Sequence, residues 1–352
     1  MNTYIYMLVT LVVMLTLMKL MFSELQGRTA KKATNIRWYL QYNEKFNYGR
    51  TNSIIILCIF CYLIASEQEM FTMIWVMELV GFLAVGVIAD ILSQFLSYYY
   101  IKVRFSGAIK EGILLKEEVK QALQEVDEED PYTRDFNYDT YSEVSNYLKQ
   151  EDHLAIVSVD GGEFVSKYPT LPPITYVVEA KPDKANQVLA DRELKITTCT
   201  KDGKMPFKDE KLDIVLNELS NYDKFEMFRV LKPGGYVVID QMGSDNYKEI
   251  IGMFIPFRMK GSWDKENCSK TLHDIGFEIV HGLEDRGYIR FKTMASVFHF
   301  MRSLSPERVD KYELYINFYA SILKTIKEQH FFDLTTHKFM VVAKKPEESK
   351  GV

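Results

Sequence analysis

Cysteine is scarce in this chain of 352 residues, which contains only four. So small and scattered a set excludes a disulfide framework and a zinc site built on cysteine. Cys58 and Cys61 are spaced as a CxxC motif, but they lie inside the apolar run ILCIFCYLIA. A redox-active pair needs a polar, reachable thiolate, so we interpret both side chains as packing residues. The other two are Cys199 and Cys268.

Histidine is also sparse, and no two of the six histidines have the i, i+4 spacing that would place both on one helix face as metal ligands. The sequence therefore predicts no metal site.

A large excess of charge of one sign is lacking too, because 43 Lys and Arg against 48 Asp and Glu give a net charge of −5. No nucleic-acid partner is expected from that balance. With 47% hydrophobic and 26% charged residues, a disordered chain is excluded.

Long apolar runs occupy much of the first hundred residues. Residues 4–22 carry a single charge, Lys19, and a helix of that length crosses a hydrocarbon core of ~30 Å. A cleaved signal peptide is the alternative, but it would need a positive n-region and a small-residue cleavage site. Further apolar runs at residues 52–66 and 70–92 bring the predicted number of transmembrane helices to about three. The run at 52–66 is short, and could instead lie at the interface.

The third run contains two carboxylates, and intramembrane acids usually face protein, water or headgroups. We expect Asp90 to be interfacial, near the end of its span, and Glu78 to make a helix–helix contact. Residues 23–52 are rich in Lys and Arg, whereas the connection at 66–69 is acidic. The positive-inside rule places the basic loop and everything after residue 101 in the cytoplasm. The sequence thus predicts a multi-pass protein of the cell membrane with its soluble part on the cytoplasmic side.

The remaining chain reads as a connector followed by a soluble domain. Apolar residues recur at helical spacing over 109–126, and the acidic run before Pro131 ends that helix. The predicted domains are a membrane region over 1–101, a connector with an amphipathic helix over 102–140, a soluble domain over 141–346 and a tail over 347–352.

From residue 153 short apolar runs alternate with amphipathic, charged segments. This alternation predicts an α/β domain whose parallel sheet is covered by helices on both faces. In such sheets ligands bind beyond the carboxyl ends of the strands, near the switch point. The predicted strands span residues 153–159, 175–179, 194–199, 212–216 and 236–240, with helices over 183–190 and 223–230.

Several of these strand ends carry residues suited to a ligand. The first strand runs into a glycine turn at Gly161 and Gly162, which permits close backbone approach. The second ends at Glu179, whose carboxylate can accept hydrogen bonds from a ribose diol, and Asp202 follows the third. Each feature alone is weak, because glycine turns and strand-end acids are commonly structural. The ordered set points to one family.

Residues 205–243, MPFKDEKLDIVLNELSNYDKFEMFRVLKPGGYVVIDQMG, resemble class I S-adenosylmethionine-dependent methyltransferases, specifically their bacterial ubiquinone-biosynthesis-like branch. That branch shows Leu-Pro-Phe, an acidic pair, Asp-Leu-Val and Arg-Val-Leu-Lys-Pro-Gly-Gly. The resemblance covers about residues 140–345 and implies a Rossmann-like class I methyltransferase domain, with a mostly parallel sheet and a closing antiparallel hairpin. Segments 274–279 and 338–344 look like the last two strands of that fold.

The resemblance also implies a cofactor, S-adenosylmethionine, and residues that hold it. Of the family's glycine-rich turn only residues 161–163 are retained, while Ser158 and Asp160 stand where the family has glycines. The implied cofactor-binding residues are Gly161, Gly162, Glu163, Glu179 at the ribose hydroxyls, Asp202 at the adenine amino group, Met205 beside the ring, and Asn217 where the fourth strand opens.

The resemblance and the apolar N-terminal region together predict a membrane-anchored methyltransferase with a small-molecule acceptor, possible classes being lipids and quinones. The expected partners are the lipid bilayer and this acceptor. No catalytic residue is assigned, because methyl transfer mainly requires positioning. The degraded glycine turn keeps an alternative open: a catalytically inactive methyltransferase-fold sensor or interaction module at the membrane. Aromatic side chains of the C-terminal third, Trp263 among them, could line an acceptor pocket or form the core of a helical cap.

Overall fold

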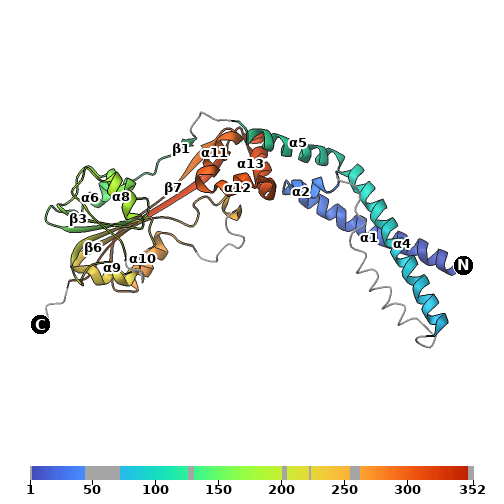
Figure 1. Cartoon of the computed structure of the whole chain (residues 1–352), viewed down its shortest axis with the longest axis horizontal. Coiled ribbons are helices and arrows are strands. Elements are labelled where there is room, and N and C mark those ends of the chain that lie inside the picture. The colour runs from blue at the N-terminus through green and yellow to red at the C-terminus, as the bar shows by residue number, and fades with distance from the viewer. Residues whose placement is uncertain are drawn as a thin grey trace. The chain divides into compact units, whose positions relative to one another are not determined.

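The computed structural model describes residues 2–43, 72–125, 131–199, 204–221, 223–253 and 262–347, with side chains from residue 9 onward. The chain forms two compact units, one of residues 1–130 and 292–332 and the other of residues 131–291 and 333–352. Residues 292–332, which were expected within the soluble domain, are therefore part of the first unit. Figure 1 labels the elements of both units.

The first unit is helical throughout its described part. Helices α1 and α4 pack against each other, and α5 packs against α2 and α13. A small core of Tyr39, Ile101, Phe105 and Ile109 lies where α2, α4 and α5 meet. The helix predicted over 109–126 is confirmed as α5 as far as Ala122. The helices are α1 (Asn2–Lys32), α2 (Ile36–Leu40), α4 (Met73–Arg104), α5 (Ser106–Ala122), α11 (Met294–Leu304), α12 (Pro306–Asp310) and α13 (Ile316–Gln329), with a 3-10 turn at Tyr312–Tyr315.

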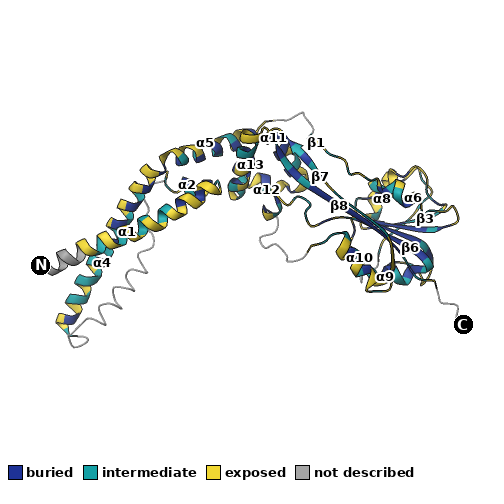
Figure 2. Cartoon of the chain, turned by 180° about the vertical axis from the view of Figure 1, so that it is seen from behind, coloured by how far each residue is buried: buried dark blue, intermediate teal, exposed yellow. Residues whose placement is uncertain are grey.

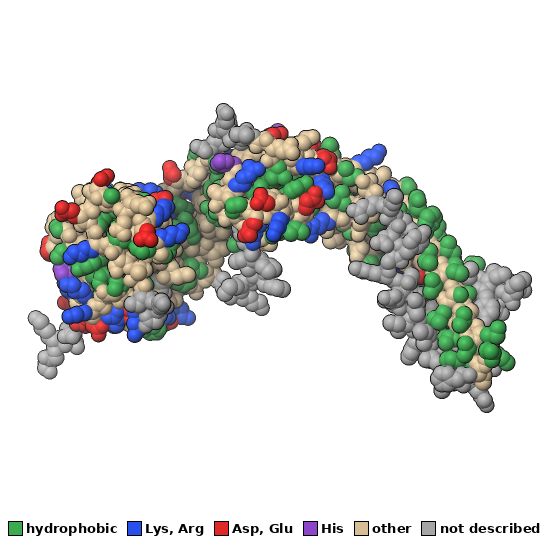
Figure 3. All heavy atoms as spheres, in the orientation of Figure 1, with side chains coloured by type: hydrophobic (Ala, Val, Ile, Leu, Met, Phe, Trp, Pro, Cys, Tyr) green, Lys and Arg blue, Asp and Glu red, His purple; other side chains and the backbone are tan. Residues whose placement is uncertain are grey.

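Two helices of the described chain are long and apolar enough to cross a membrane. They are Val9–Lys32, with a mean hydropathy of 1.5, and Met73–Arg104, with a mean hydropathy of 2.1. Length and composition alone carry this finding, since core helices and signal sequences can meet the same criteria. Figure 3 shows hydrophobic side chains gathered on the surface of α4, where Met77 and Val80 are exposed. The span predicted at 52–66 lies outside the described residues, so two candidates stand where about three were expected.

A partly buried ion pair joins α1 to α4. Lys19 Nζ contacts Asp90 Oδ1, donates to Ser93 Oγ at 2.7 Å, and faces a carboxylate that is only 2% exposed. Gln94 Nε2 donates to the other carboxylate oxygen at 2.6 Å. The placement of Asp90 at a membrane interface stays a prediction, while within α4 the residue is buried against α1. A buried carboxylate needs an opposite charge and hydrogen bonds, which Lys19 and Gln94 supply.

The second unit is built on one eight-stranded sheet with the order β1-β7-β8-β6-β5-β2-β3-β4. Strands β2 to β6 pair in parallel, whereas β8 pairs antiparallel with β6 and β1 antiparallel with β7. This confirms the predicted α/β class and the five predicted parallel strands. The strands are β1 (Tyr132–Thr133), β2 (His153–Ser158), β3 (Ile174–Glu179), β4 (Lys195–Thr197), β5 (Leu212–Glu218), β6 (Leu231–Met242), β7 (Glu278–Phe291) and β8 (Phe332–Lys344).

Helices cover both faces of this sheet, as predicted. In β2, Leu154 and Ile156 face one core with α6 (Thr140–Ser145), α7 (Glu163–Ser166) and α8 (Pro182–Val188). Ala155 and Val157 face the other core with α9 (Lys224–Val230) and α10 (Lys265–His273). Figure 1 shows the two sets of helices on opposite sides of the strands, and Figure 2 shows the strands buried between them. Since both faces are covered, the central strands are continuous apolar runs.

The first prediction concerns the ion pair between α1 and α4. Asp90→Leu should lower the free energy of unfolding by about 1–3 kcal/mol, because the partly buried Lys19 ammonium, which is 29% exposed, loses its counter-charge. Lys19→Leu combined with Asp90→Leu should recover most of that loss, since no charge is then left. Thermal unfolding of the full chain in detergent micelles measures both.

Glu117→Leu is a matched control, because Glu117 is an exposed acid on α5 of the same unit. It should change stability little. A double variant as unstable as Asp90→Leu alone would contradict an electrostatic origin of the effect.

Candidate functional site

The candidate site lies at the carboxyl edge of the parallel strands. The register brings the last residues of neighbouring strands side by side, with Ser158 opposite Glu179 and Glu218 opposite Asp240. Asn217 of β5 lies opposite Val157, the residue before the last one of β2. Neighbouring strands lie about 4.8 Å apart, so these polar side chains form one cluster. Parallel sheets bind ligands at this edge, at the point where the strand order reverses and neighbouring strands are followed by connections that run in opposite directions. In this sheet that point lies between β2 and β5.

The glycine turn after β2 has a left-handed backbone at both of its glycines. Gly161 and Gly162 have φ angles of +79° and +90°, which only glycine adopts without strain. A Cβ on Gly161 would lie 2.4 Å from Cδ of Lys184, and one on Gly162 would lie 3.0 Å from Leu189. The two glycines therefore also permit close packing of the turn against α8 and the residue that follows it.

Asp160 satisfies the backbone amides of this turn. Its Oδ1 accepts a hydrogen bond from the Gly162 amide at 3.0 Å, and its Oδ2 accepts one from the Phe164 amide at 2.7 Å. In the family, this turn packs bare backbone against the methionine end of the cofactor. Here the chain places its own carboxylate on those amides. A second carboxylate at the same point would meet a like charge and occupied donors.

Glu163 lies at the start of α7 and faces solvent. Its carboxylate pairs with Lys184 Nζ at 2.5 Å, and this lysine also donates to the Asp160 carbonyl at 3.0 Å. The hydrogen bond from Lys184 holds the pKa of Glu163 below its usual value. The pair ties α7 to α8 and leaves Glu163 among the exposed residues.

Glu179 is the most enclosed acid of the predicted set, at 1% exposure. Its Oε1 accepts hydrogen bonds from the Ser158 hydroxyl and, at 3.2 Å, from the Gly162 amide. Its Oε2 is buried and has no hydrogen-bond partner among the described residues. Buried polar atoms are nearly always paired in folded proteins, so a free carboxylate oxygen at a strand end suits a hydroxyl-bearing ligand. The fit to a ribose diol is therefore good at this residue.

A chain of side-chain amides leads from the site to a pocket. Asn217 is fully buried, and its Oδ1 accepts from Gln241 Nε2 at 3.1 Å, whereas its Nδ2 has no partner among the described residues. Gln241 Oε1 in turn accepts from the Trp263 indole at 2.8 Å. The pocket beside them has a volume of about 620 Å³, which is the size of a small-molecule site. Its lining residues are Asn221, Asp223, Lys224, Phe225, Gln241, Trp263 and Thr271.

The structure adds a buried cluster that the sequence did not indicate. Asp240, fully buried two residues before the end of β6, pairs with Lys338 Nζ of β8 at 3.0 Å and accepts a hydrogen bond from the Thr140 hydroxyl. Lys338 also donates to Thr140 Oγ1 at 2.9 Å. Burial raises the pKa of Asp240, and Lys338 and Thr140 oppose that rise. The one feature of the sequence that could have indicated Asp240 is its position at the end of the fifth predicted strand, which matches the position of Glu179 at the end of the second predicted strand.

Glu218 is a buried carboxyl group with a raised pKa. It is 7% exposed, and burial, together with the charges of Asp160 and Asp240, raises its pKa to about 7. Lys338 and Lys167 act in the opposite direction. Its Oε2 has no partner among the described residues. A carboxyl group with this pKa can either donate or accept a proton at neutral pH.

The other predicted residues lie apart from this cluster or outside the described chain. Met205 is buried in the core on the α9 and α10 side, and its amide donates to Glu226 Oε2 at 3.0 Å. Asp202 falls outside the described residues. The buried His337 contacts Glu284 at 2.7 Å and accepts from the Asp245 amide, which is a structural role. Within the described ranges, no group of three His, Cys, Asp or Glu side chains could hold a metal ion.

The second prediction concerns the pH dependence that Glu218 produces. Its folded-state pKa of about 7 exceeds the ordinary value of 4.5, so the native state binds this proton more tightly than the unfolded state. The associated stabilisation is complete below pH 4.5 and is lost as the pH rises to about 7. Glu218→Gln should therefore be more stable than the parent above pH 7, by up to about 3 kcal/mol, and differ little below pH 4.5.

Urea unfolding of the full chain in micelles across this pH range measures the difference. Glu193→Gln, which changes an exposed glutamate of the same unit, is the matched control and should leave the pH profile unaltered. A stability difference for Glu218→Gln that does not vary with pH would contradict the assigned pKa.

Comparisons with known proteins add fold likeness only. No family model and no curated protein matches the chain. A Bacillus halodurans protein provisionally called a methyltransferase is 16% identical, with 59% of this chain and 99% of that chain covered and a TM-score of 0.42. A Methanosarcina mazei SAM-dependent methyltransferase is 15% identical, with 60% of this chain and 100% of that chain covered and a TM-score of 0.35. The geranyl diphosphate C-methyltransferase of Streptomyces coelicolor is 14% identical, with 58% of this chain and 74% of that chain covered and a TM-score of 0.35. These TM-scores are too low to carry an argument, so the fold assignment rests on the strand order.

Proposed function

We propose that this chain is a membrane-anchored, S-adenosylmethionine-dependent methyltransferase that binds its cofactor at the carboxyl edge of the second unit. The observation that carries the proposal is Glu179, a buried acid with one unpartnered oxygen at the end of the second parallel strand. The surrounding support is a parallel sheet with an antiparallel closing strand, and the resemblance of residues 205–243 to the ubiquinone-biosynthesis-like branch.

Glu179 and Asp160 would act in opposite directions on the binding of the cofactor. Bound there, S-adenosylmethionine supplies a methyl group already activated by its sulfonium, so the protein mainly orients the acceptor and excludes water. Glu179 would accept hydrogen bonds from the ribose hydroxyls through Oε2. Asp160 occupies the amides of the glycine turn, so the methionine end would bind weakly or in a shifted position.

The pocket beside Gln241 is the proposed place of the acceptor. Trp263 and Phe225 provide apolar surface there, while the amide chain through Asn217 links the pocket to the strand ends. Glu218 would take up a proton on Oε2 if the acceptor must lose one on methylation, since its pKa is about 7. An acceptor that is methylated without losing a proton needs no such base.

The apolar helices α1 and α4 support the anchoring part of the proposal. Their length and hydropathy suit a bilayer, and the basic residues after α1 favour a cytoplasmic second unit. Tethering raises the local concentration of membrane-dissolved molecules around the site. A lipid- or quinone-like acceptor is therefore the class we propose.

The third prediction tests cofactor binding through Glu179. Calorimetric titration of S-adenosylmethionine and S-adenosylhomocysteine into the full chain in micelles should give binding in the micromolar range. Glu179→Ala should weaken it about tenfold or more, because the ribose hydroxyls lose a charged acceptor. Asp183→Ala, at an exposed acid of α8, should leave it unchanged. No binding at millimolar ligand to the folded chain would overturn the enzyme proposal in favour of a methyltransferase-fold sensor or interaction module.

The fourth prediction isolates the effect of Asp160. Asp160→Gly should tighten S-adenosylmethionine binding about tenfold, because the Phe164 amide becomes available to the ligand carboxylate and a like charge is removed. Methylthioadenosine lacks that carboxylate, so its affinity should stay the same. Equal tightening of both ligands would contradict the assigned role of Asp160.

A further inference from the structure

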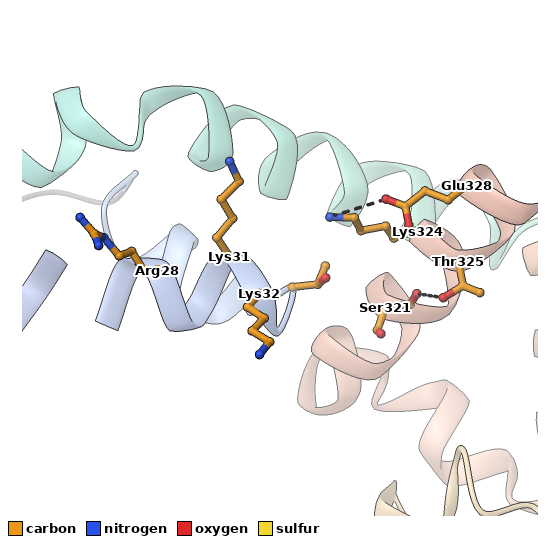
Figure 4. A pocket seen from close by; sticks show the side chains of 8 residues that line it. Arg28, Lys31, Lys32, Ser321, Lys324, Thr325 and Glu328 are labelled. Carbon is orange, nitrogen blue, oxygen red and sulfur yellow. Dashed lines mark hydrogen bonds and ion pairs between the residues drawn. The ribbon is translucent and has the colours of Figure 1, made fainter. Parts of the chain in front are cut away.

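A basic pocket lies in the first unit, apart from the site described above. It has a volume of about 580 Å³ and is lined by the last turns of α1 and by α13. Figure 4 shows Arg28, Lys31 and Lys32 extending from α1, with Lys324 extending from α13. These two helices are nearly three hundred residues apart in the sequence, so folding alone assembles this set of cations.

The charge of this pocket is only partly balanced by the chain, because Arg28 and Lys324 are paired with acids whereas Lys31 and Lys32 are not. Four cations line it, and Glu328 is the one acid among the lining residues. Lys31 and Lys32 have no ion pair or hydrogen bond from their side chains within the described part of the chain. Arg28 is 3.2 Å from Glu24, while Lys324 lies 3.8 Å from Glu111 and 3.9 Å from Glu328. The pocket therefore carries positive charge that remains available to a ligand.

The helix dipole explains only part of this arrangement. Basic residues in the last turn of a helix interact favourably with its carbonyl end, which accounts for Lys31 and Lys32. It does not account for Lys324, which reaches the same pocket from another helix. Hydroxyl groups complete the lining, including those of Thr34 and Ser321. Lysines with neighbouring hydroxyls are donors suited to the oxygens of a phosphate group.

The end of α1 holds Thr34 in a conformation that non-glycine residues rarely adopt. Its φ is +50°, and the turn is closed by a hydrogen bond of 2.9 Å from the Asn35 amide to the Ala30 carbonyl. Glycine is the usual residue at this point of a helix end, and a β-branched side chain there is strained. The strained threonine places a hydroxyl-bearing residue in the pocket wall, where glycine would place none.

The cations of the pocket follow the apolar run of α1. That run ends at Phe22, and Arg28, Lys31 and Lys32 lie about 9 Å to about 15 Å further along the helix axis. The headgroup layer of each leaflet is about 5–8 Å thick, so these residues follow it, and their long basic side chains reach the headgroups by extending back toward the membrane. Clusters of Lys and Arg just beyond a membrane helix attract anionic lipids. This step rests on the proposed membrane anchoring.

We infer that this pocket binds the phosphate group of an anionic phospholipid headgroup and so joins α13 to α1 at the membrane surface. The test is titration of short-chain phosphatidylglycerol into the full chain in neutral micelles, with short-chain phosphatidylcholine and inorganic phosphate as comparisons. The parent chain should prefer phosphatidylglycerol. Lys31→Gln with Lys32→Gln should weaken that binding about thirtyfold, the factor that corresponds to about 1 kcal/mol for each lysine.

Lys110→Gln with Lys311→Gln is the matched control, since both are exposed lysines of the first unit outside the pocket. The control should change the affinity less than twofold. An equal loss in both double variants would overturn the pocket in favour of diffuse surface charge. Displacement of the lipid by inorganic phosphate at the lipid's own concentration would overturn the lipid and identify a soluble phosphate compound as the ligand.

Flotation of the full chain with pure phosphatidylcholine vesicles separates this inference from the anchoring on which it rests. A chain that does not float lacks the anchor, and the proposed function then fails in that part. A chain that floats but shows no preference for phosphatidylglycerol over phosphatidylcholine keeps the anchor and overturns the pocket alone.

Discussion

A strand that is buried on both faces can place polar side chains only where it ends, and this constraint organises the second unit. In β2 the residues alternate between the two cores, so neither face offers a position for a charge. Polar groups therefore collect at the carboxyl edge, where Glu179, Asn217 and Glu218 lie within one or two strand positions of each other. Several of their atoms are buried without a partner in the described chain. Such atoms are destabilising unless a ligand or water satisfies them, which is the reason for proposing a ligand at this edge.

The same edge is partly satisfied by the chain itself. Asp160 bonds the amides of the glycine turn, and Lys338 with Thr140 holds the buried carboxylate of Asp240. The turn is ordered with an aspartate at position 160, because this side chain accepts hydrogen bonds from the turn amides while Gly161 and Gly162 have the left-handed backbone. The negative charge of Asp160 also helps to raise the pKa of Glu218. The geometry of the turn and the protonation of Glu218 thus depend on one residue.

Charges in the first unit are sorted by their surroundings. Between α1 and α4, the buried Asp90 is paired with the partly buried Lys19, since an isolated carboxylate there would be destabilising. At the end of α1, Lys31 and Lys32 are exposed to solvent, where a cation is tolerated without an acid. The apolar helix thus carries one neutralised charge along its length and a set of available cations at its end. This distribution suits a helix that passes from hydrocarbon to headgroups.

The sequence by itself determined what depends on local pattern. Continuous apolar runs, a glycine turn and strand-end acids were sufficient to predict the parallel sheet, the conformation of residues 161–162 and the location of Glu179 at the edge. Contacts between distant segments were beyond its reach, because they depend on which elements become neighbours. Asp90 was expected at an interface, and only the packing of α4 on α1 brought Lys19 to it. Likewise, strand order alone brings Lys338 to Asp240 as its ion-pair partner. Helix packing alone places Lys324 in the same pocket as Lys31. Local sequence fixes backbone geometry and burial, whereas the partner of a charge is decided by the tertiary fold.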